Sequence, residues 1–230
     1  MRTLGLGMSG TDVMEIQATL SKLGFYSGAL DGIFGPQTRQ AVIEFQTRYG
    51  LTPDGVIGTE TYSSMERYLL GYDNYTIRRS DTLYEIAGRY GTSPALILAA
   101  NPGLSADFLR VGQRIVVPYG FPVVDTNIDY TYEIMERDIA GLRARYPFLE
   151  TGSAGQSSLG MILYYIRLGR GPNQVFYNGA HHSLEWITSP LLMKFIEDVS
   201  AAYAQNRSLG GYDISEVWDA SSIYIVPMVN

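Results

Sequence analysis

Residues 176–190 read Phe176-Tyr177-Asn178-Gly179-Ala180-His181-His182-Ser183-Leu184-Glu185-Trp186-Ile187-Thr188-Ser189-Pro190, and they hold both histidines of the 230-residue chain. Hydrophobic patterning predicts a short buried strand over 174–177 and an amphipathic helix over 188–206. A His182-x-x-Glu185 pair on the turn between them can bring an imidazole nitrogen and a carboxylate oxygen onto one zinc ion. A surface hydrogen bond is the competing interpretation, because so short a motif needs structural context.

The remainder of the carboxyl-terminal half alternates helices with apolar strands. A helix is predicted over 130–146, a buried strand over 161–168 and a last strand over 222–226. Such alternation indicates a mixed α/β sheet that helices cover on both faces. The helix over 188–206 is expected to bury one apolar face, which consists of Leu191, Leu192, Phe195, Ile196 and Val199.

Four sequence matches occur in order between residues 130 and 230. They are Tyr146-Pro147, then Ser153-Ala154-Gly155-Gln156-Ser157 with Leu159-Gly160, then Gly179-Ala180-His181-His182-Ser183-Leu184-Glu185-Trp186, and finally Val226-Pro227-Met228-Val229-Asn230. Together they resemble the amino-terminal part of the zinc carboxypeptidases of the carboxypeptidase A and T type. The resemblance implies an α/β domain of which this sequence holds only the first part.

That resemblance implies that His182 and Glu185 are two zinc ligands. It also implies that the third ligand, the general-base glutamate and the substrate-binding arginines lie downstream of Asn230, so that no catalytic residue falls within the chain. His181 is not expected to share the ion, since it is the immediate neighbour of His182. Leu184 replaces the basic residue that the family usually has between the two ligands, which puts the usual substrate contacts in doubt.

Composition sets broader limits. The chain is long enough for two or three modest domains, and 46% hydrophobic with 17% charged residues is ordinary for a globular protein. A formal net charge of −6 argues against nucleic acid as a partner. Cysteine is absent, which excludes disulfides and thiolate zinc sites. We see no signal peptide and no apolar run long enough to span a membrane.

The amino-terminal region contains an internal repeat. Asp31-Gly32-Ile33-Phe34-Gly35-Pro36-Gln37-Thr38 returns as Asp54-Gly55-Val56-Ile57-Gly58-Thr59-Glu60-Thr61, each copy being a tight turn before a helix start. Helices are predicted over 11–23, 36–49 and 59–70. The runs 23–28 and 49–56 make this module similar to the peptidoglycan-binding domain type 1. A generic three-helix packing unit is the alternative, since a fold does not specify a ligand.

The next module is predicted to be strand, helix, helix, strand. Its elements cover 75–77, 83–90 with Ser80 or Asp81 as cap, 94–101, and 114–118. The segments 80–87, 100–102 and 109–113 resemble the LysM domain. That resemblance implies binding of N-acetylglucosamine-containing glycans through Asp81, Thr82, Leu83, Asn101 and Pro102. Each of these residues also has a structural interpretation, such as capping, packing or ending a helix.

The whole chain is therefore expected to be a multidomain α+β protein. The modules span residues 1–71, 74–119 and 127–230, being a three-helix module, a βααβ module and a truncated α/β carboxypeptidase-like domain with a mixed sheet. This combination resembles bacterial γ-D-glutamyl-diaminopimelate endopeptidases, which implies a zinc peptidase acting on peptidoglycan stem peptides at the cell wall or spore envelope. The alternative is a non-catalytic peptidoglycan-binding protein with a remnant peptidase domain.

Overall fold

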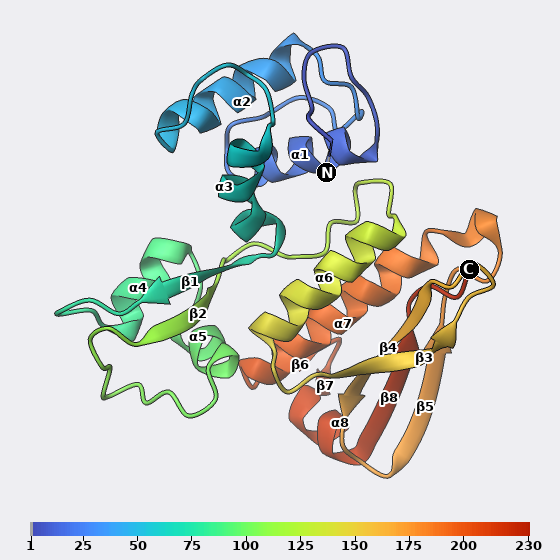
Figure 1. Ribbon diagram of the computed structural model, residues 1–230. Coiled ribbons are helices and arrows are strands. Elements are labelled where there is room, and N and C mark those ends of the chain that lie inside the picture. The colour runs from blue at the N-terminus through green and yellow to red at the C-terminus, as the bar shows by residue number, and fades with distance from the viewer. Residues whose placement is uncertain (1) are drawn as a thin grey trace. The chain divides into compact units, whose positions relative to one another are not determined.

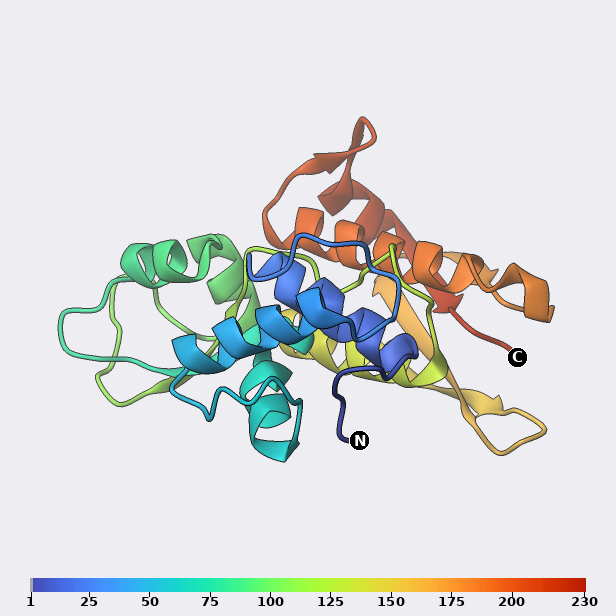
Figure 2. The same ribbon diagram turned by 90° about the horizontal axis from the view of Figure 1, so that it is seen from above.

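The computed structural model describes residues 2–230, which divide into two compact units. The first contains residues 2–70 and Asn127–Thr131, and the second contains Gly71–Thr126 and Tyr132–Asn230. Figure 1 labels the elements of each unit, and Figure 2 shows the same elements from above. Within residues 2–230, no helix has both the length and the apolar character that crossing a membrane requires.

Three helices build the first unit, as the sequence predicts. They are α1 (Thr11–Lys22), α2 (Pro36–Arg48) and α3 (Thr59–Leu69). Gly32 and Gly55 have positive φ angles of 69° and 73° at the two Asp-Gly turns, which explains glycine at the same place in both repeats. The buried faces of the helices and turns share a core that includes Ile16, Leu20, Phe34, Phe45, Ile57 and Met65.

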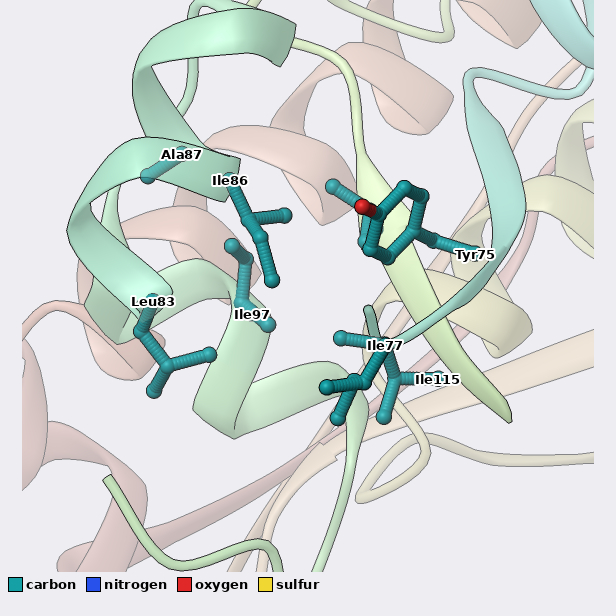
Figure 3. Packing of buried hydrophobic residues seen from close by; sticks show 8 residues of the cluster. Tyr75, Ile77, Leu83, Ile86, Ala87, Ile97 and Ile115 are labelled. Carbon is teal, nitrogen blue, oxygen red and sulfur yellow. The ribbon is translucent and has the colours of Figure 1, made fainter. Parts of the chain in front are cut away.

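The first part of the second unit has the predicted βααβ order. Its elements are β1 (Tyr72–Thr76), α4 (Leu83–Tyr90), α5 (Pro94–Ala100) and β2 (Arg114–Pro118). The two strands pair antiparallel, with Tyr75 opposite Ile115. Figure 3 shows how the strands and helices meet in one apolar core, whose labelled members are Tyr75, Ile77, Leu83, Ile86, Ala87, Ile97 and Ile115.

Two details of this module differ from the sequence prediction. The first strand begins at Tyr72, three residues before the predicted start at Tyr75. The cap of α4 is Thr82, and not Ser80 or Asp81 as predicted. The Thr82 hydroxyl accepts a hydrogen bond from the Glu85 amide while the Glu85 carboxylate accepts one from the Thr82 amide, each at 3.2 Å. This reciprocal box satisfies two amides at once, which a cap at Asp81 would not do.

The remainder of the second unit is a four-stranded mixed sheet with helices. The elements are α6 (Tyr132–Arg145), β3 (Glu150–Gln156), β4 (Ile162–Gly169), β5 (Asn173–Asn178), the 3-10 turn η1 (Ser183–Glu185), α7 (Thr188–Ala204), β6 (Ser208–Leu209), β7 (Tyr212–Asp213), α8 (Ile214–Ala220) and β8 (Ser221–Val226). The strand order is β3-β4-β8-β5, in which β5 runs parallel to β8 and the other neighbours are antiparallel. A small separate hairpin joins β6 to β7.

The helices lie on one face of this sheet in residues 2–230, which corrects the prediction of two covered faces. Leu168 of β4 lines one small cavity together with Val199 of α7 and Trp218 of α8, and the Tyr164 hydroxyl of β4 donates to Glu136 of α6. Figure 1 shows the same arrangement of α6, α7 and α8 beside the sheet. The predicted burial of β5 is also wrong, since every residue of this edge strand is exposed.

The buried face of α7 is partly different from the predicted one. Ile196 and Val199 are buried as expected, but Leu191 and Phe195 are exposed. Met193 and the charged residue Glu197 are buried in their place. Periodicity identified the helix but missed the rotation of its face, because a buried carboxylate carries no apolar signal.

Candidate functional sites

The candidate metal-binding residues lie on the loop that leaves β5, at the edge where the parallel strands β5 and β8 both end. Backbone hydrogen bonds tie this loop to the segment after β8. The Gly179 amide donates to the Val226 carbonyl and the Asn230 amide donates to the Ala180 carbonyl, both at 3.1 Å. A Cβ on Gly179 would lie 2.9 Å from the Thr188 Oγ1, so this close approach requires glycine.

One hydroxyl group fixes the shape of the loop. Thr188 Oγ1 donates to the Glu185 carbonyl and accepts from the Ala180 amide, each at 2.7 Å. Ala180 itself has a φ angle of 52°, an uncommon conformation for a residue with a side chain. Strain of this kind persists only where the surroundings hold it, and it gathers at functional sites.

Within this loop His182 and Glu185 come together as the sequence predicts. His182 Nδ1 lies 2.9 Å from Glu185 Oε1, and the His182 amide donates to Glu185 Oε2 at 3.4 Å. The imidazole is 81% exposed and the carboxylate 49%, so the pair is open to solvent. A neutral imidazole nitrogen and a carboxylate oxygen at this separation can both reach one cation.

Each member of the pair changes the ionisation of the other. The hydrogen bond and the negative charge of Glu185 raise the pKa of His182, and the hydrogen bond from His182 lowers the pKa of Glu185. Glu185 therefore stays ionised at neutral pH. A proton on His182 competes with a metal ion for Nδ1, because a ligating imidazole must be neutral.

His181 points to a different partner. Its Nε2 lies 2.7 Å from Asn178 Oδ1, a side chain at the end of β5. The adjacent histidines therefore have separate contacts, and only His182 joins Glu185. Among residues 2–230, no group of three or more His, Cys, Asp or Glu side chains could hold a metal ion. The described chain thus brings two zinc-type ligands together and not three.

Three of the five predicted glycan-binding residues have internal roles at the start of α4. Asp81 accepts a hydrogen bond from the Tyr75 hydroxyl at 2.7 Å and pairs with Arg89. Thr82 caps the helix, and Leu83 is buried in the core of the module. Glycan contacts at these positions stay a prediction, and their side chains are already committed to the fold.

The other two lie after α5. Asn101 Nδ2 donates to the carbonyls of Ile97 and Val116 at 2.7 Å, and its Oδ1 accepts from the Val116 amide at 2.8 Å. These bonds attach the end of the helix to β2. Pro102 alone of the five is an exposed side chain with no such internal role, so its neighbourhood is the better place to look for a ligand.

A hollow of about 230 Å³ follows directly in the chain. Its lining comes from Gly103, Leu104, Ser105, Phe108, Arg110 and Gln113. Phe108 is 67% exposed, which gives the hollow an aromatic face beside the donors of Arg110 and Gln113. The sequence prediction missed this place, although a phenylalanine inside a Gly- and Ser-containing loop is a detectable signal.

Comparisons with known proteins identify all three modules. Residues 9–65 match the family model of the putative peptidoglycan binding domain, residues 75–118 match that of the LysM domain, and residues 135–230 match that of zinc carboxypeptidase. The chain combines these three domains, which confirms the resemblances seen in the sequence.

Individual relatives cover parts of this arrangement. Gamma-D-glutamyl-L-diamino acid endopeptidase 1 of Lysinibacillus sphaericus is 32% identical over 108 residues, covering 47% of this chain and 27% of that protein. N-acetylmuramoyl-L-alanine amidase CwlM of Mycobacterium tuberculosis is 48% identical over 126 residues, covering 53% of this chain and 26% of that protein. The crystal structure of the SleB N-terminal domain is 41% identical, covers 28% of this chain and 88% of that chain, and has a TM-score of 0.28. The chain spans about a quarter of the length of the two curated relatives.

Proposed function

We propose that this chain belongs to a zinc-dependent peptidase of peptidoglycan stem peptides, of the γ-D-glutamyl-diaminopimelate endopeptidase type, which its two binding modules hold at the bacterial cell wall or spore envelope. The observation that carries the proposal is the 2.9 Å approach of His182 Nδ1 to Glu185 Oε1 at the end of β5. It falls within the zinc carboxypeptidase match and follows two wall-binding domains in one chain.

His182 and Glu185 would hold the zinc ion, His182 through Nδ1 and Glu185 through its carboxylate. When bound, zinc supplies polarisation of a scissile carbonyl and a lowered pKa of its bound water. The lowered pKa of Glu185 keeps that side chain ionised for this role. The two hydrogen bonds of the Thr188 hydroxyl, to Ala180 and Glu185, hold the loop in its shape. Within residues 2–230, no third side chain joins the pair in a group that could hold a metal ion.

The binding modules contribute by localisation. Peptidoglycan is insoluble, so a peptidase attached to it meets its substrate at a raised effective concentration. Glycan recognition by the LysM domain is proposed at the hollow of Phe108 and Arg110, where an aromatic face lies beside hydrogen-bond donors. Such a combination suits a sugar ring, which has apolar faces and polar edges.

A non-catalytic peptidoglycan-binding protein is the second candidate. The observation that favours it is that only two zinc-type ligands converge within residues 2–230. Both candidates share the wall-binding modules, and they differ only in whether a peptide bond is cleaved.

Activity on a muropeptide with a γ-D-Glu-diaminopimelate bond separates them. The chain is assayed with added zinc and with a chelator, and binding to peptidoglycan sacculi is measured in parallel. Chelator-sensitive cleavage that His182→Ala abolishes and His181→Ala retains supports the peptidase. Retained sacculus binding without cleavage in any of these conditions supports the binding protein for this chain.

A further inference from the structure

The segment that joins the LysM domain to α6 is hydrogen-bonded to the LysM domain at its start. The Tyr119 amide donates to the Gly71 carbonyl at 2.9 Å, and the Gly120 amide donates to the Tyr90 carbonyl at 3.0 Å. The ring of Phe121 stacks on that of Tyr119 with centroids 5.1 Å apart. Residues 119–121 therefore extend the LysM fold and do not form a free tether.

The next residues of the same segment are bonded to the carboxypeptidase-like domain. Glu197 of α7 accepts from the Val123 amide at 2.7 Å through Oε1 and from the Val124 amide at 3.1 Å through Oε2. Arg145 of α6 donates to the Phe121 carbonyl at 3.0 Å, and its Nη1 lies 3.7 Å from Glu197 Oε1. One ion pair thus makes hydrogen bonds to three backbone groups of the segment, at Phe121, Val123 and Val124.

Burial makes this arrangement costly to open. The side chains of Arg145 and Glu197 are 5% and 4% exposed, and Val123 and Val124 are buried as well. A buried ion pair is tolerable only when hydrogen bonds offset its loss of water, and here the backbone of the segment supplies three of them, although Arg145 Nε has no partner. Moving the segment away would remove the hydrogen bonds that the two charged side chains make to its backbone, and it would leave the amides of Val123 and Val124 without their acceptor.

Direct packing surrounds the same point. Helix α5 of the LysM domain contacts α6 and α7, and both LysM strands contact α6. A Cβ on Gly71 would lie 2.6 Å from Val123 Cγ2 and 3.2 Å from Arg145 Nη1, so the start of β1 approaches the segment as closely as glycine allows. The two domains accordingly belong to one compact unit.

We propose that residues 119–124 and the Arg145–Glu197 pair form a rigid joint that fixes the LysM domain in one orientation on the carboxypeptidase-like domain. Arg145 and Glu197 are then positioning residues, since a glycan strand on the LysM domain presents its stem peptides to the His182–Glu185 loop from one direction. This consequence for the substrate rests on the proposed function. The rigidity of the joint does not.

Nuclear magnetic relaxation of the whole 230-residue chain tests the joint directly. The amides of the LysM domain and those of residues 132–230 are expected to give one common rotational correlation time. The Val123 and Val124 amides are expected to exchange with solvent as slowly as those of the central strands. Two different correlation times, or rapid exchange at both valines, would overturn the proposal.

A variant with a matched control assigns the rigidity to the ion pair. Glu197→Gln keeps the size of the side chain but removes its charge and one acceptor, whereas Asp198→Asn alters the next residue of α7, an exposed partner of Lys194. Glu197→Gln should separate the correlation times and open 119–124 to proteolysis while the sheet stays folded, and Asp198→Asn should do neither. An unchanged common correlation time in Glu197→Gln would contradict the role of the pair. If this variant does not fold, the correlation times of the two domains in the wild-type chain still test whether the joint is rigid.

These measurements need neither zinc nor substrate, so they separate the joint from the proposed function. If the LysM and carboxypeptidase-like domains tumble as one body but the chain cleaves no muropeptide, the rigid joint is supported and the proposed peptidase function of this chain is contradicted. If the chain cleaves muropeptide while the two domains tumble independently, the peptidase function is supported and the rigid joint is contradicted.

Discussion

Gln17 and Gln46 make equivalent hydrogen bonds in the two halves of the three-helix module. Each Nε2 donates to the aspartate of the following Asp-Gly turn, at 2.9 Å and 2.8 Å respectively, and each Oε1 accepts from the glycine amide of that turn at 2.9 Å. Each Nε2 also lies 3.1 Å from a threonine hydroxyl of the next helix. The partners are Asp31, Gly32 and Thr38 in the first half and Asp54, Gly55 and Thr61 in the second.

Loss of one of these amides should destabilise the module strongly. Gln46 is buried, and Gln46→Leu leaves the buried Gly55 amide without its acceptor and removes one of the hydrogen bonds to the Asp54 carboxylate. We expect a loss of about 2–3 kcal/mol in the free energy of unfolding, because a buried polar group without a partner is costly. Urea denaturation measures this loss. Gln40→Leu on the exposed side of the same helix is the control and should change it by less than about 0.5 kcal/mol.

Asp81 should make the LysM domain sensitive to acid. Burial opposes its ionisation, but hydrogen bonds from the Arg78 amide, Tyr75 and Arg89 together lower the pKa of Asp81. A carboxylate with a lowered folded pKa stabilises fully above its unfolded value of about 3.9, and this contribution is lost as the pH falls through the folded value. The temperature midpoint of unfolding should therefore decrease as the pH is lowered below about 4.

The substitution Asp81→Asn tests this acid sensitivity. It should lower the thermal midpoint at neutral pH and flatten the fall below about pH 4, because the titrating group is gone. Asp107→Asn, at an exposed carboxylate of the same domain, should keep the wild-type profile. An identical acid profile in Asp81→Asn and wild type would show that this carboxylate is not the responsible group.

Phe108→Ala should weaken binding of chitin oligosaccharides and sacculi by about fivefold or more, as expected from losing about 1 kcal/mol of aromatic contact. Isothermal titration measures the soluble oligosaccharide, and sedimentation measures the sacculi. Tyr212→Ala removes a similarly exposed aromatic ring from the carboxypeptidase-like domain and should leave binding unchanged. Undiminished glycan binding by Phe108→Ala would contradict a binding site at this hollow and would favour the predicted site around Asp81.

Zinc binding should depend on His182 and on pH. Glu185 raises the pKa of His182, so protons displace zinc from this nitrogen at a higher pH than from an ordinary histidine, whose pKa is about 6.5. Zinc affinity should therefore fall on acidification and recover above that raised pKa. A competition assay with a zinc indicator measures it. His182→Ala should lose at least tenfold in affinity, whereas His181→Ala, whose ring contacts Asn178, should retain it.

Features that depend on neighbours along the chain could be predicted from the sequence alone. Most helix boundaries follow from hydrophobic periodicity, and the meeting of His182 with Glu185 follows from their spacing of three residues on one 3-10 turn. The two Asp-Gly turns likewise follow from residues whose backbone preferences are local.

The burial of particular surfaces and the pairing of distant polar groups depend on the tertiary fold. Periodicity favoured Leu191 and Phe195 for the buried face of α7, and the fold buries Glu197 there because the amides of Val123 and Val124 and the charge of Arg145 meet it. Those partners lie more than 50 residues away in the sequence, at separations of 73 and 74 for the two amides. A carboxylate is buried only where such distant partners converge, and no local pattern encodes that convergence.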